Sequence, residues 1–427
     1  MLTQSGESFL AQYEALESRF SDPALSIERR KIMNEWIFNR PKEMLTELLS
    51  CRPIFQIPGH GQMSAITFVT THKDVLEVLD RNRIFSVRKY EEKMRPPRGP
   101  FVLGMEDGDQ YRKELEILRE VLPQAINAQT LISTIGQIVD HIFDGIAPKG
   151  RLDIIQDVAW LVPLRLNIIY FGLHEKDETT LKRWFRDIYK DLFLNLRENT
   201  QWTEDADKAV SELNAYLKVL MSGPADDTVL GRLMQRKADL GLEGIRRNVF
   251  GLTVGVVETC LKAVARTLDQ FLRRPEQLRE AQAAAKQGDK QTVLDYAFEA
   301  MRFNPQNHVL FRWCEQDCTI AEQSDHAMRV PQNSLVFAAT LSAMFDPEVF
   351  PDPEKFDPAR PKENYLFFGH GLHECLGRYI GPVVLQAVLM RLLTLENLRR
   401  APNDPYQLNP VNVLPDHFLV DYGPADS

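Results

Sequence analysis

The residues with the clearest chemical potential lie between Phe367 and Arg378, in the sequence FFGHGLHECLGR. Glycines surround a single cysteine, Cys375, and a largely apolar run from Ile380 to Leu393 follows it. A thiolate is a good ligand for iron and zinc, and glycines allow a backbone to bend sharply or to pass close to a flat cofactor. Cys375 is therefore the first candidate for a metal ligand in this chain.

Other interpretations of the cysteines remain open from the residues alone. A free cysteine is most often a small buried apolar residue. His370, His373 and Cys375 could instead bind zinc, although the sequence lacks the paired cysteines and the fourth ligand of common zinc sites. Cys314 and Cys318 could also ligate a metal, but no matching pair accompanies them, so we interpret them as unpaired thiols.

Composition and charge narrow the class of protein. A chain of 427 residues can form several domains, but a large enzyme can also occupy this length as one unit. The 51 basic and 60 acidic residues give a net charge of -9, and like charges are not grouped into blocks along the sequence. This distribution argues against a general nucleic-acid binder, which would need a basic surface. The five cysteines are odd in number and lack the spacing of a disulfide-bonded scaffold, which indicates a reducing compartment. Met1–Ser18 has no apolar core and no run of about eighteen apolar residues occurs, so we expect a cytoplasmic protein without a membrane anchor.

The N-terminal part of the chain combines helical and strand patterns. Charged, amphipathic spacing predicts helices between Phe9 and Leu49. Two short apolar segments, Pro53–Gly59 and Ala65–Thr70, flank a Gly-His-Gly turn and predict a hairpin. A short helix over His72–Asp80 is expected to follow.

A loop and further helices come next. Arg88–Gly104 contains three prolines and several basic residues, which predicts a loop. A helix is expected from Asp107 to about Leu122, and helical patterning dominates from Ile132 to Leu220.

The pattern from Leu242 to Leu272 predicts one long helix, which at about 1.5 Å per residue would cross a domain from end to end. Midway along it, Glu258 and Thr259 interrupt an apolar context. Glu258 needs either a hydrogen-bonding partner or a wet cavity, because a buried lone carboxyl is costly. The Thr259 hydroxyl could bond to a carbonyl one turn earlier and open the helix, and Gly255 removes the side chain that would block the gap. A surface or capping role for the Glu-Thr pair is the alternative.

Towards the C-terminus, a polar linker is predicted at about Ala281–Lys290, followed by a helix over Val293–Arg302. Glu299 and Arg302 lie on one face of this helix at i, i+3 spacing, which is also common for surface pairs. Arg312 lies in a strand-like run, where a buried guanidinium would need an anion.

The window around Cys375 resembles the haem-binding loop of the cytochrome P450 family, Phe-Gly-x-Gly-x-His-x-Cys-x-Gly, at every fixed position. The resemblance covers the chain from about Pro53 onward. It implies a mainly α fold with small β-sheets (α+β), a triangular helix-rich prism with haem b between the long central helix and the helix after the cysteine loop. It also implies a single domain over residues 1–427, with a β-rich N-terminal lobe at about 50–90.

The resemblance assigns roles residue by residue. Cys375 would be the axial iron ligand, and Glu258 and Thr259 would form the acid-alcohol pair that handles dioxygen and protons. Glu299, Arg302 and Arg360 would form a structural triad that holds the haem loop. The residues that would contact the cofactor are Arg312, His373, Arg112, Phe368, Gly369, Gly377 and Gly255. Val256, His308 and Val309 would border the substrate, and Arg88–Gly104 would either cover the distal pocket or form a solvated connection. In the family, a histidine-containing motif on the helix from Asp107 binds a haem propionate. Here Gln110 occupies the position of that histidine, so Arg112 is the nearest substitute.

By resemblance, the chain is a haem-thiolate monooxygenase that hydroxylates or epoxidises a largely apolar small molecule with dioxygen. Because the sequence has no nucleotide-binding glycine motif, electrons are expected from a separate ferredoxin or flavodoxin and its reductase, docking near Arg378. Two alternatives remain open. One is a haem-thiolate enzyme that uses peroxide or rearranges a hydroperoxide. The other is a non-catalytic module that docks a carrier protein.

Overall fold

The computed structural model describes residues 8–17, 23–59, 61–94, 98–122, 128–147, 150–174, 176–195, 199–402, 408 and 414–423. The chain forms two compact units. The sheet unit comprises Met1–Ser86, Arg302–His373 and Leu408–Val413. The helical unit comprises Val87–Met301, Glu374–Gln407 and Leu414–Ser427. Helices predominate and the sheets are small, as the sequence predicts.

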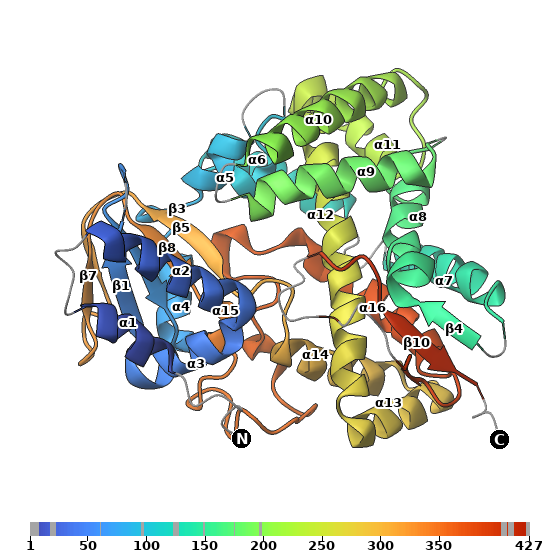
Figure 1. Ribbon diagram of the computed structural model, residues 1–427. Helices are drawn as coiled ribbons and strands as arrows, with labels where there is room; N and C mark the ends of the chain where they lie inside the picture. Colours follow the sequence, from blue (N-terminus) through green and yellow to red (C-terminus); the bar gives the residue numbers. More distant parts are fainter. Residues whose placement is uncertain are drawn as a thin grey trace. The chain divides into compact units, whose positions relative to one another are not determined.

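Five described strands of the sheet unit form one mixed sheet in the order β1-β2-β8-β5-β3 (Figure 1). The strands are β1 (Ile54–Pro58), β2 (Ala65–Val69), β3 (Phe85–Ser86), β5 (Leu310–Cys314) and β8 (Leu335–Ala338). β1 and β2 pair antiparallel with Ile54 opposite Val69, which confirms the predicted hairpin; the histidine of its turn lies outside the described residues. β2 and β8 pair parallel, although far apart in sequence. A separate pair, β6 (Cys318–Ile320) and β7 (Met328–Val330), is antiparallel.

Helices complete the sheet unit. They are α1 (Phe9–Glu17), α2 (Pro23–Asn39), α3 (Pro41–Cys51), α4 (His72–Asp80) and α15 (Thr340–Ala343). The Phe9 ring meets Phe55 of β1 edge-on at 5.6 Å between centroids, so the N-terminal helices share an aromatic core with the sheet. α4 has the predicted bounds because the Thr71 hydroxyl accepts a hydrogen bond from the Asp74 backbone N–H and caps its first turn.

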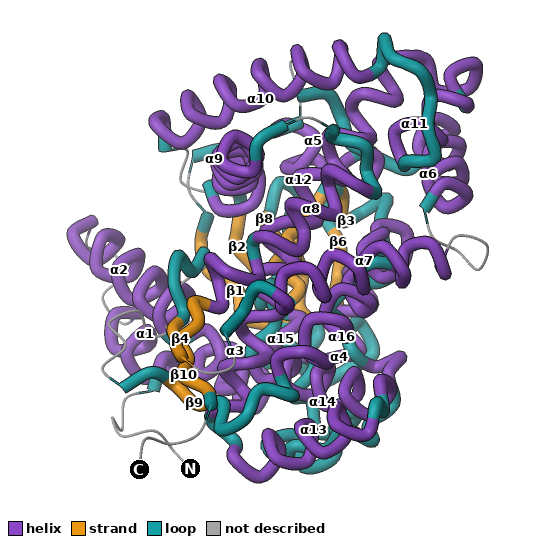
Figure 2. Tube along the Cα trace, turned by 90° about the vertical axis from the view of Figure 1, so that its right-hand side faces the viewer, coloured by secondary structure: helices purple, strands orange, loops and turns teal. Residues whose placement is uncertain are grey.

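The helical unit consists mostly of α-helices and short helical turns, drawn as purple tubes in Figure 2. Its α-helices are α5 (Arg88–Lys93), α6 (Asp109–Val121), α7 (Ala128–Asp144), α8 (Leu161–Ile169), α9 (Glu178–Tyr189), α10 (Thr200–Leu220), α11 (Val229–Gln235), α12 (Lys237–Leu272), α13 (Pro275–Gln287), α14 (Lys290–Phe303, whose last two residues belong to the sheet unit) and α16 (Gly381–Leu392). Three short strands, β4 (Gly150–Asp153), β9 (Arg399–Arg400) and β10 (Leu419–Tyr422), form a small antiparallel sheet. π-helical turns precede α8 at η2 (Ile154–Ala159) and follow α9 at η3 (Lys190–Leu194).

α12 is the long helix that the sequence predicts, drawn in yellow in Figure 1. Gly241, at φ 65° and ψ 167°, breaks its first turn, so the regular helix begins at about the predicted position. α12 is also long and apolar enough to cross a membrane by length and composition alone. However, 83% of its apolar window is buried within the protein, as in the core helix of a globular fold.

Two predictions about local structure are wrong. Most of the segment interpreted as a polar linker, residues 281–287, belongs to α13, which starts with Pro275 and is followed by Gly288 in the left-handed conformation (φ 75°); only Gly288 and Asp289 connect it to α14. Proline at the start and glycine just past the end are typical helix boundaries. The predicted loop Arg88–Gly104 begins with α5, although its prolines 96 and 97 lie outside the described residues.

The segment 98–100 is clamped within the helical unit. The Arg98 guanidinium is buried and donates hydrogen bonds to Asp191 (2.6 Å) and Asp207 (2.9 Å). On α12, Arg246 donates to the backbone carbonyl of Arg98 at 2.9 Å, and Arg247 donates to that of Pro100 at 2.8 Å. These contacts exclude a solvated connection at residues 98–100. We call this arrangement the Arg98 clamp.

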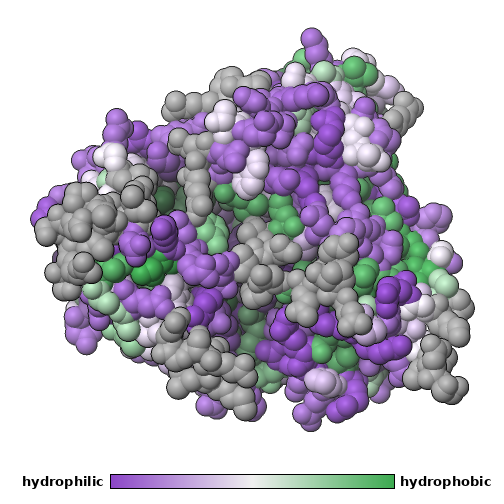
Figure 3. All heavy atoms as spheres, in the orientation of Figure 1, coloured by the Kyte–Doolittle hydropathy of each residue, from purple (hydrophilic) through white to green (hydrophobic). Residues whose placement is uncertain are grey.

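Hydrophilic side chains predominate on the face shown in Figure 3. Among the described residues, the large apolar side chains that are exposed are spread over several helices, among them Phe38 on α2, Trp202 on α10 and Leu242 on α12. Isolated exposed apolar residues of this kind are normal on protein surfaces.

Candidate active site

Cys375 is the second residue of the segment Glu374–Gln407 of the helical unit, just before the turn η6 (Leu376–Tyr379) and α16. Its Sγ accepts a hydrogen bond from the backbone N–H of Gly377 at 3.2 Å, which makes it the N-cap of η6. The Cys375 side chain is partly open to solvent, yet surrounding protein is close enough that burial raises the pKa of the thiol. Coordination to a metal would deprotonate the thiol outright, and the Gly377 N–H favours that charged form.

Gly377 leaves the sulfur approachable from one side. A Cβ placed on Gly377 would lie 3.2 Å from the Cys375 Sγ, so any side chain there would press on the sulfur. Three features suit a planar cofactor with a thiolate ligand, such as haem. They are the soft sulfur of Cys375, the backbone N–H of Gly377 directed at it, and the lack of a side chain at Gly377. The residues present in the helical unit therefore fit that group.

The predicted hydrogen bond from Thr259 to a carbonyl one turn earlier is present in α12, but the helix is not opened there: its non-helical backbone angles lie at Gly241. The Thr259 hydroxyl donates to the carbonyl of Gly255 at 2.6 Å and lies 3.3 Å from that of Val256. A Cβ added to Gly255 would meet no heavy atom within 4 Å, so the backbone on this side borders open space. Thr259 and Val256 are both partly exposed, in contrast to their fully buried neighbour Val257.

Glu258 is fully buried and is partnered by an arginine from α9. Its Oε1 accepts a hydrogen bond from Nε of Arg186 at 3.0 Å, while Oε2 has no hydrogen-bond partner among the described residues. Burial raises the pKa of the Glu258 carboxyl, and the nearby Arg186 guanidinium opposes that rise. The buried-partner interpretation of Glu258 is therefore correct, and the surface or capping interpretation is wrong.

Arg186 is held in place by several groups of the helical unit. Its guanidinium lies over the ring of Trp160 at 4.7 Å, pairs with Asp416 and donates to the carbonyl of Pro415 at 3.3 Å. A planar guanidinium can stack on an aromatic face while its N–H groups bind acceptors in its plane. Arg186 thus connects the buried Glu258 to Asp416, whose side chain is largely exposed.

Lys262, which the sequence reasoning did not single out, lies one turn beyond Glu258 and has no exposed surface. Its Nζ donates to the hydroxyl of Tyr189, on α9, at 2.8 Å. Burial, together with the positive charge of Arg266, lowers the pKa of Lys262 to about 7. Glu258, Lys262 and Arg266 recur every four residues and share one helix face, so this spacing was the signal available in the sequence.

A Lys262→Met variant is expected to unfold with a different pH dependence. The folded pKa of about 7 lies below the ordinary value of 10.5, so between these values the folded protein binds fewer protons at this site than the unfolded chain. The free energy of unfolding of the wild type therefore rises with pH across this window and is lowest below about pH 7. Methionine does not titrate, so the stability of the variant relative to the wild type is expected to be highest at and below pH 7 and to fall towards pH 10 by at most about 1.4 kcal/mol per pH unit.

Urea unfolding of both proteins from pH 6 to pH 10 measures this difference. Lys208→Met, at an exposed position of α10, controls for the loss of a surface lysine. A stability difference that stays constant over the whole pH range would contradict the assignment of a displaced Lys262 titration.

Two predicted triad members come together in the sheet unit. Arg302, at the end of α14, is fully buried and donates to the carbonyls of Met344 (3.0 Å) and Lys355 (3.2 Å). Arg360 donates to the same Lys355 carbonyl at 3.2 Å, and to the carbonyls of Pro351 (2.9 Å) and Asp352 (3.0 Å). Both guanidinium groups therefore fix the proline-rich segment before the cysteine loop. Glu299, also fully buried, lies one turn before Arg302 on α14.

The sheet unit also holds the other predicted cofactor and pocket residues. Arg312 is buried on β5 and donates to the carbonyl of Phe311 at 2.9 Å. His308 and Val309, just before β5, are partly exposed, as are Phe368 and His373. Gly369 has φ 72°, a left-handed conformation in which a side chain would be strained.

Arg112 does not have the environment expected of an anion-binding residue. Its side chain is 63% exposed and forms two hydrogen bonds of 2.9 Å with the carboxylate of Asp107, five residues earlier. Gln110 instead donates to Glu114, which is buried and accepts from Arg247 and Asn248. These contacts argue against the propionate role that the resemblance implied for Arg112.

The zinc interpretation gains no support from the side chains. In the described part of the chain, no group of three or more His, Cys, Asp or Glu residues is close enough to hold a metal ion. His370, one of the proposed ligands, lies 3.2 Å from the carboxylate of Asp80.

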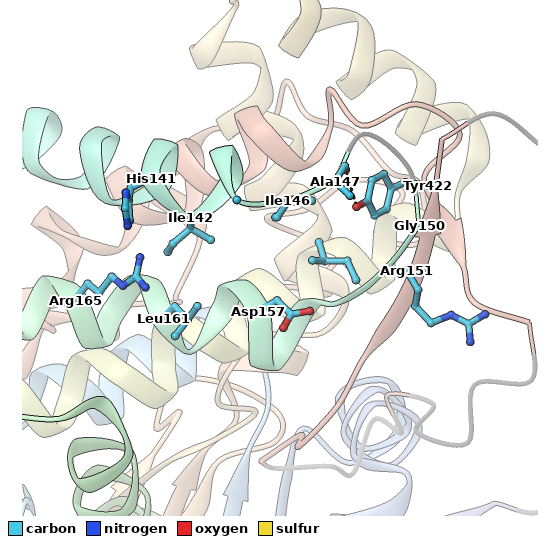
Figure 4. A pocket seen from close by; sticks show the side chains of 12 residues that line it. His141, Ile142, Ile146, Ala147, Gly150, Arg151, Asp157, Leu161, Arg165 and Tyr422 are labelled. Atoms are coloured by element: carbon cyan, nitrogen blue, oxygen red, sulfur yellow. Dashed lines mark hydrogen bonds between the residues drawn. The ribbon is translucent and has the colours of Figure 1, made fainter.

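The helical unit also has a surface pocket of about 470 Å³ between α7, η2, α8 and the β4-β10 strands (Figure 4). It is lined by apolar residues and by the polar side chains of His141, Asp157, Arg165 and Tyr422, while the Arg151 side chain points away from it. None of the predicted site residues lines this pocket. Its chemistry is therefore separate from that of Cys375.

Comparisons with known proteins show similarity to one family in sequence and in fold. The family model described as Cytochrome P450 matches residues 152–399. Cytochrome P450 monooxygenase PikC of Streptomyces venezuelae is 28% identical over 272 residues, 60% of either chain, which is less than two thirds of that relative's length. Mycinamicin IV hydroxylase/epoxidase of Micromonospora griseorubida is 25% identical over 364 residues, 81% of this chain and 86% of the relative. The structure of cytochrome P450 CYP109Q5 from Chondromyces apiculatus matches with a TM-score of 0.76 at 20% identity, covering 92% and 97% of the two chains, which shows a shared fold.

Proposed function

Since the chain belongs to the cytochrome P450 family and is an oxidoreductase of the monooxygenase type, we propose that it hydroxylates or epoxidises a largely apolar small organic molecule. The observation that carries the proposal is the exposed Cys375 thiol, whose sulfur lies against the bare backbone of Gly377 and accepts a hydrogen bond from its N–H. The relative from Micromonospora is named for both hydroxylation and epoxidation, which supports these two outcomes.

We assign the cofactor as haem b, with Cys375 as the thiolate ligand. Bound haem would supply the one-electron and dioxygen chemistry, which protein side chains lack. Gly377 and Gly369 allow the backbone to approach the ring, and Phe368 would shield the sulfur. Arg312 and His373 are the proposed donors to the propionates, and the exposed pairing of Arg112 with Asp107 argues against Arg112 as a further donor.

Proton supply is assigned to α12. The Thr259 hydroxyl, held by the Gly255 carbonyl, keeps a polar group at the open side of the helix. Glu258 can carry a proton at Oε2, which has no hydrogen-bond partner in the part of the chain that the structure describes, and burial raises the pKa of this carboxyl. Arg186 holds the other oxygen and reaches Asp416, which connects this carboxyl to the protein surface.

A Thr259→Val variant is expected to lower the rate of product formation by about 10²-fold, the lower end of the range for a positioned proton donor. Valine has the same shape but lacks the hydroxyl, so electrons from the reductase should be diverted to hydrogen peroxide. Thr259→Ser keeps the hydroxyl and should retain most of the activity. Product, consumed NADPH and released peroxide are measured together. Unchanged coupling in the valine variant would remove Thr259 from the pathway.

The substrate is proposed to lie beside Val256, His308 and Val309. Val256 and Val309 are apolar, whereas His308 could anchor one polar group of an otherwise apolar molecule. The electron donor is assigned to a separate ferredoxin or flavodoxin with its reductase, docking near Arg378, a partly exposed cation next to Glu374. Such soluble partners suit a cytoplasmic location.

The proposed function is tested first by a ligand screen. Purified protein with haem is titrated with small apolar compounds, and a shift of the ferric spectrum from low to high spin identifies those that displace the water on the metal. The best compounds are then incubated with a ferredoxin, a reductase, NADPH and isotopically labelled dioxygen. Incorporation of one labelled oxygen atom supports the monooxygenase. Product formed with peroxide alone and independent of Thr259 would support the peroxide-using alternative, and protein that takes up no haem would support the recruitment module.

A further inference from the structure

Two cysteines of the sheet unit lie next to each other, outside the proposed active site. Cys314 is the last residue of β5 and Cys318 is the first residue of β6. Their Sγ atoms are 3.8 Å apart, within the range of an S–H···S hydrogen bond. A disulfide bond is about 2.05 Å long, so the sulfurs need to approach each other by only about 1.8 Å to be joined.

The turn between the two cysteines is fixed from several directions. The backbone N–H and carbonyl of Cys314 bond to Ser334 (2.9 Å) and Asn333 (2.8 Å). The Asp317 carboxylate accepts hydrogen bonds from the Gln332 backbone N–H (2.7 Å) and from Arg329 (2.6 Å). These hydrogen bonds hold the turn in place, so the two sulfurs remain close to each other. Forming the disulfide therefore requires no long loop to be closed, and the effective concentration of one thiol at the other is high.

The two thiols differ in access and in acidity. Cys314 has no exposed surface, whereas Cys318 is partly exposed. The hydrogen bond from Cys314 lowers the pKa of Cys318, and the nearby Arg81 guanidinium adds to this effect, while the same thiol pair raises the pKa of Cys314. An accessible, more acidic thiol beside a buried second thiol is the arrangement typical of a reactive cysteine with its resolving partner.

We propose that Cys314 and Cys318 form a redox-active dithiol that reacts with small-molecule disulfides and closes into an intramolecular disulfide. In the first step the Cys318 thiolate attacks one sulfur of a disulfide such as oxidised glutathione, forming a mixed disulfide and releasing one glutathione thiolate. In the second step the Cys314 sulfur loses its proton and attacks Sγ of Cys318, releasing the second glutathione. The protein thus loses two hydrogens as it is oxidised, and one disulfide is reduced to two thiols.

The test uses the full-length protein in glutathione buffers of increasing oxidised fraction. Remaining thiols are trapped by alkylation under denaturing conditions, and the peptides are identified by mass spectrometry. Oxidation is expected to remove two alkylation sites together, from Cys314 and Cys318, in a form that reducing agent restores. Cys51, an exposed cysteine at the end of α3, should instead carry a mixed disulfide with glutathione. Full alkylation of both Cys314 and Cys318 in oxidised glutathione would overturn the proposal.

Two serine variants separate the roles of the sulfurs. In Cys314→Ser the resolving thiol is missing, so Cys318 is expected to accumulate as the glutathione mixed disulfide. In Cys318→Ser the buried Cys314 should stay fully alkylatable. Equal modification of the remaining cysteine in both variants would contradict the assignment of Cys318 as the attacking thiol. The wild-type measurement needs neither variant, so a folding defect in either one leaves the central test intact.

Discussion

Replacing Cys375 by alanine is expected to abolish the red-shifted carbon monoxide band of the reduced protein. The band requires a thiolate on the iron, and Cys375 is the residue whose sulfur is exposed, capped by the Gly377 N–H and flanked by bare backbone. Alanine removes the donor while changing the fold little, because the side chain is not part of the packed core. The measurement is a reduced, carbon monoxide difference spectrum together with the haem content.

Cys51→Ala provides the matched control, because Cys51 is also an exposed cysteine but lies on α3 of the sheet unit. It should retain the full band. If Cys375→Ala kept an unaltered red-shifted spectrum, the ligand assignment and the function derived from it would both fall.

Arg302→Ala is expected to cause the largest loss of stability of the substitutions considered, about 3–5 kcal/mol. The guanidinium is fully buried and satisfies the carbonyls of Met344 and Lys355, while Phe303 and Phe345 lie against it at 4.5 and 4.6 Å. Alanine would leave the carbonyls without these donors and open a cavity between the rings. Urea unfolding gives the change in free energy.

Arg302→Lys separates charge from geometry, because lysine keeps the cation but cannot form the same planar set of hydrogen bonds. We expect it to recover only part of the loss. Arg329→Ala is the surface control: this side chain is 76% exposed in its pair with Asp317, and exposed pairs contribute about 0–1 kcal/mol. A loss at Arg302 no larger than that at Arg329 would refute the structural role.

Elements with strong local signals were predictable from the sequence. The β1-β2 hairpin follows from two apolar segments around a turn, and α4 follows from its capping threonine. α13 was missed because its alanine-rich, charged sequence was interpreted as a linker, although Pro275 and Gly288 mark both ends. The parallel pairing of β2 with β8 joins segments more than 250 residues apart, and local patterns carry no information about such a pairing.

The candidate site was predictable only where a short motif carries the chemistry. Cys375 and the Glu258-Thr259 pair could be found in this way, but their partners on other helices could not. Arg186 reaches Glu258 from 72 residues away, so only the packing of α9 on α12 reveals it. The expected propionate role of Arg112 is disfavoured because its guanidinium donates two hydrogen bonds to Asp107, five residues earlier in the chain.

The Arg98 clamp has a consequence for how readily residues 98–100 separate from α12. Its guanidinium and the Asp191 carboxylate are only 5% and 6% exposed, so dissolved ions screen their attraction little. Surface pairs such as Arg183 with Glu212 loosen as ionic strength rises, whereas residues 98–100 should stay attached to α12. Separation of residues 98–100 from α12 is therefore expected to be slow and nearly independent of salt concentration. Its rate should be set by local unfolding of this segment.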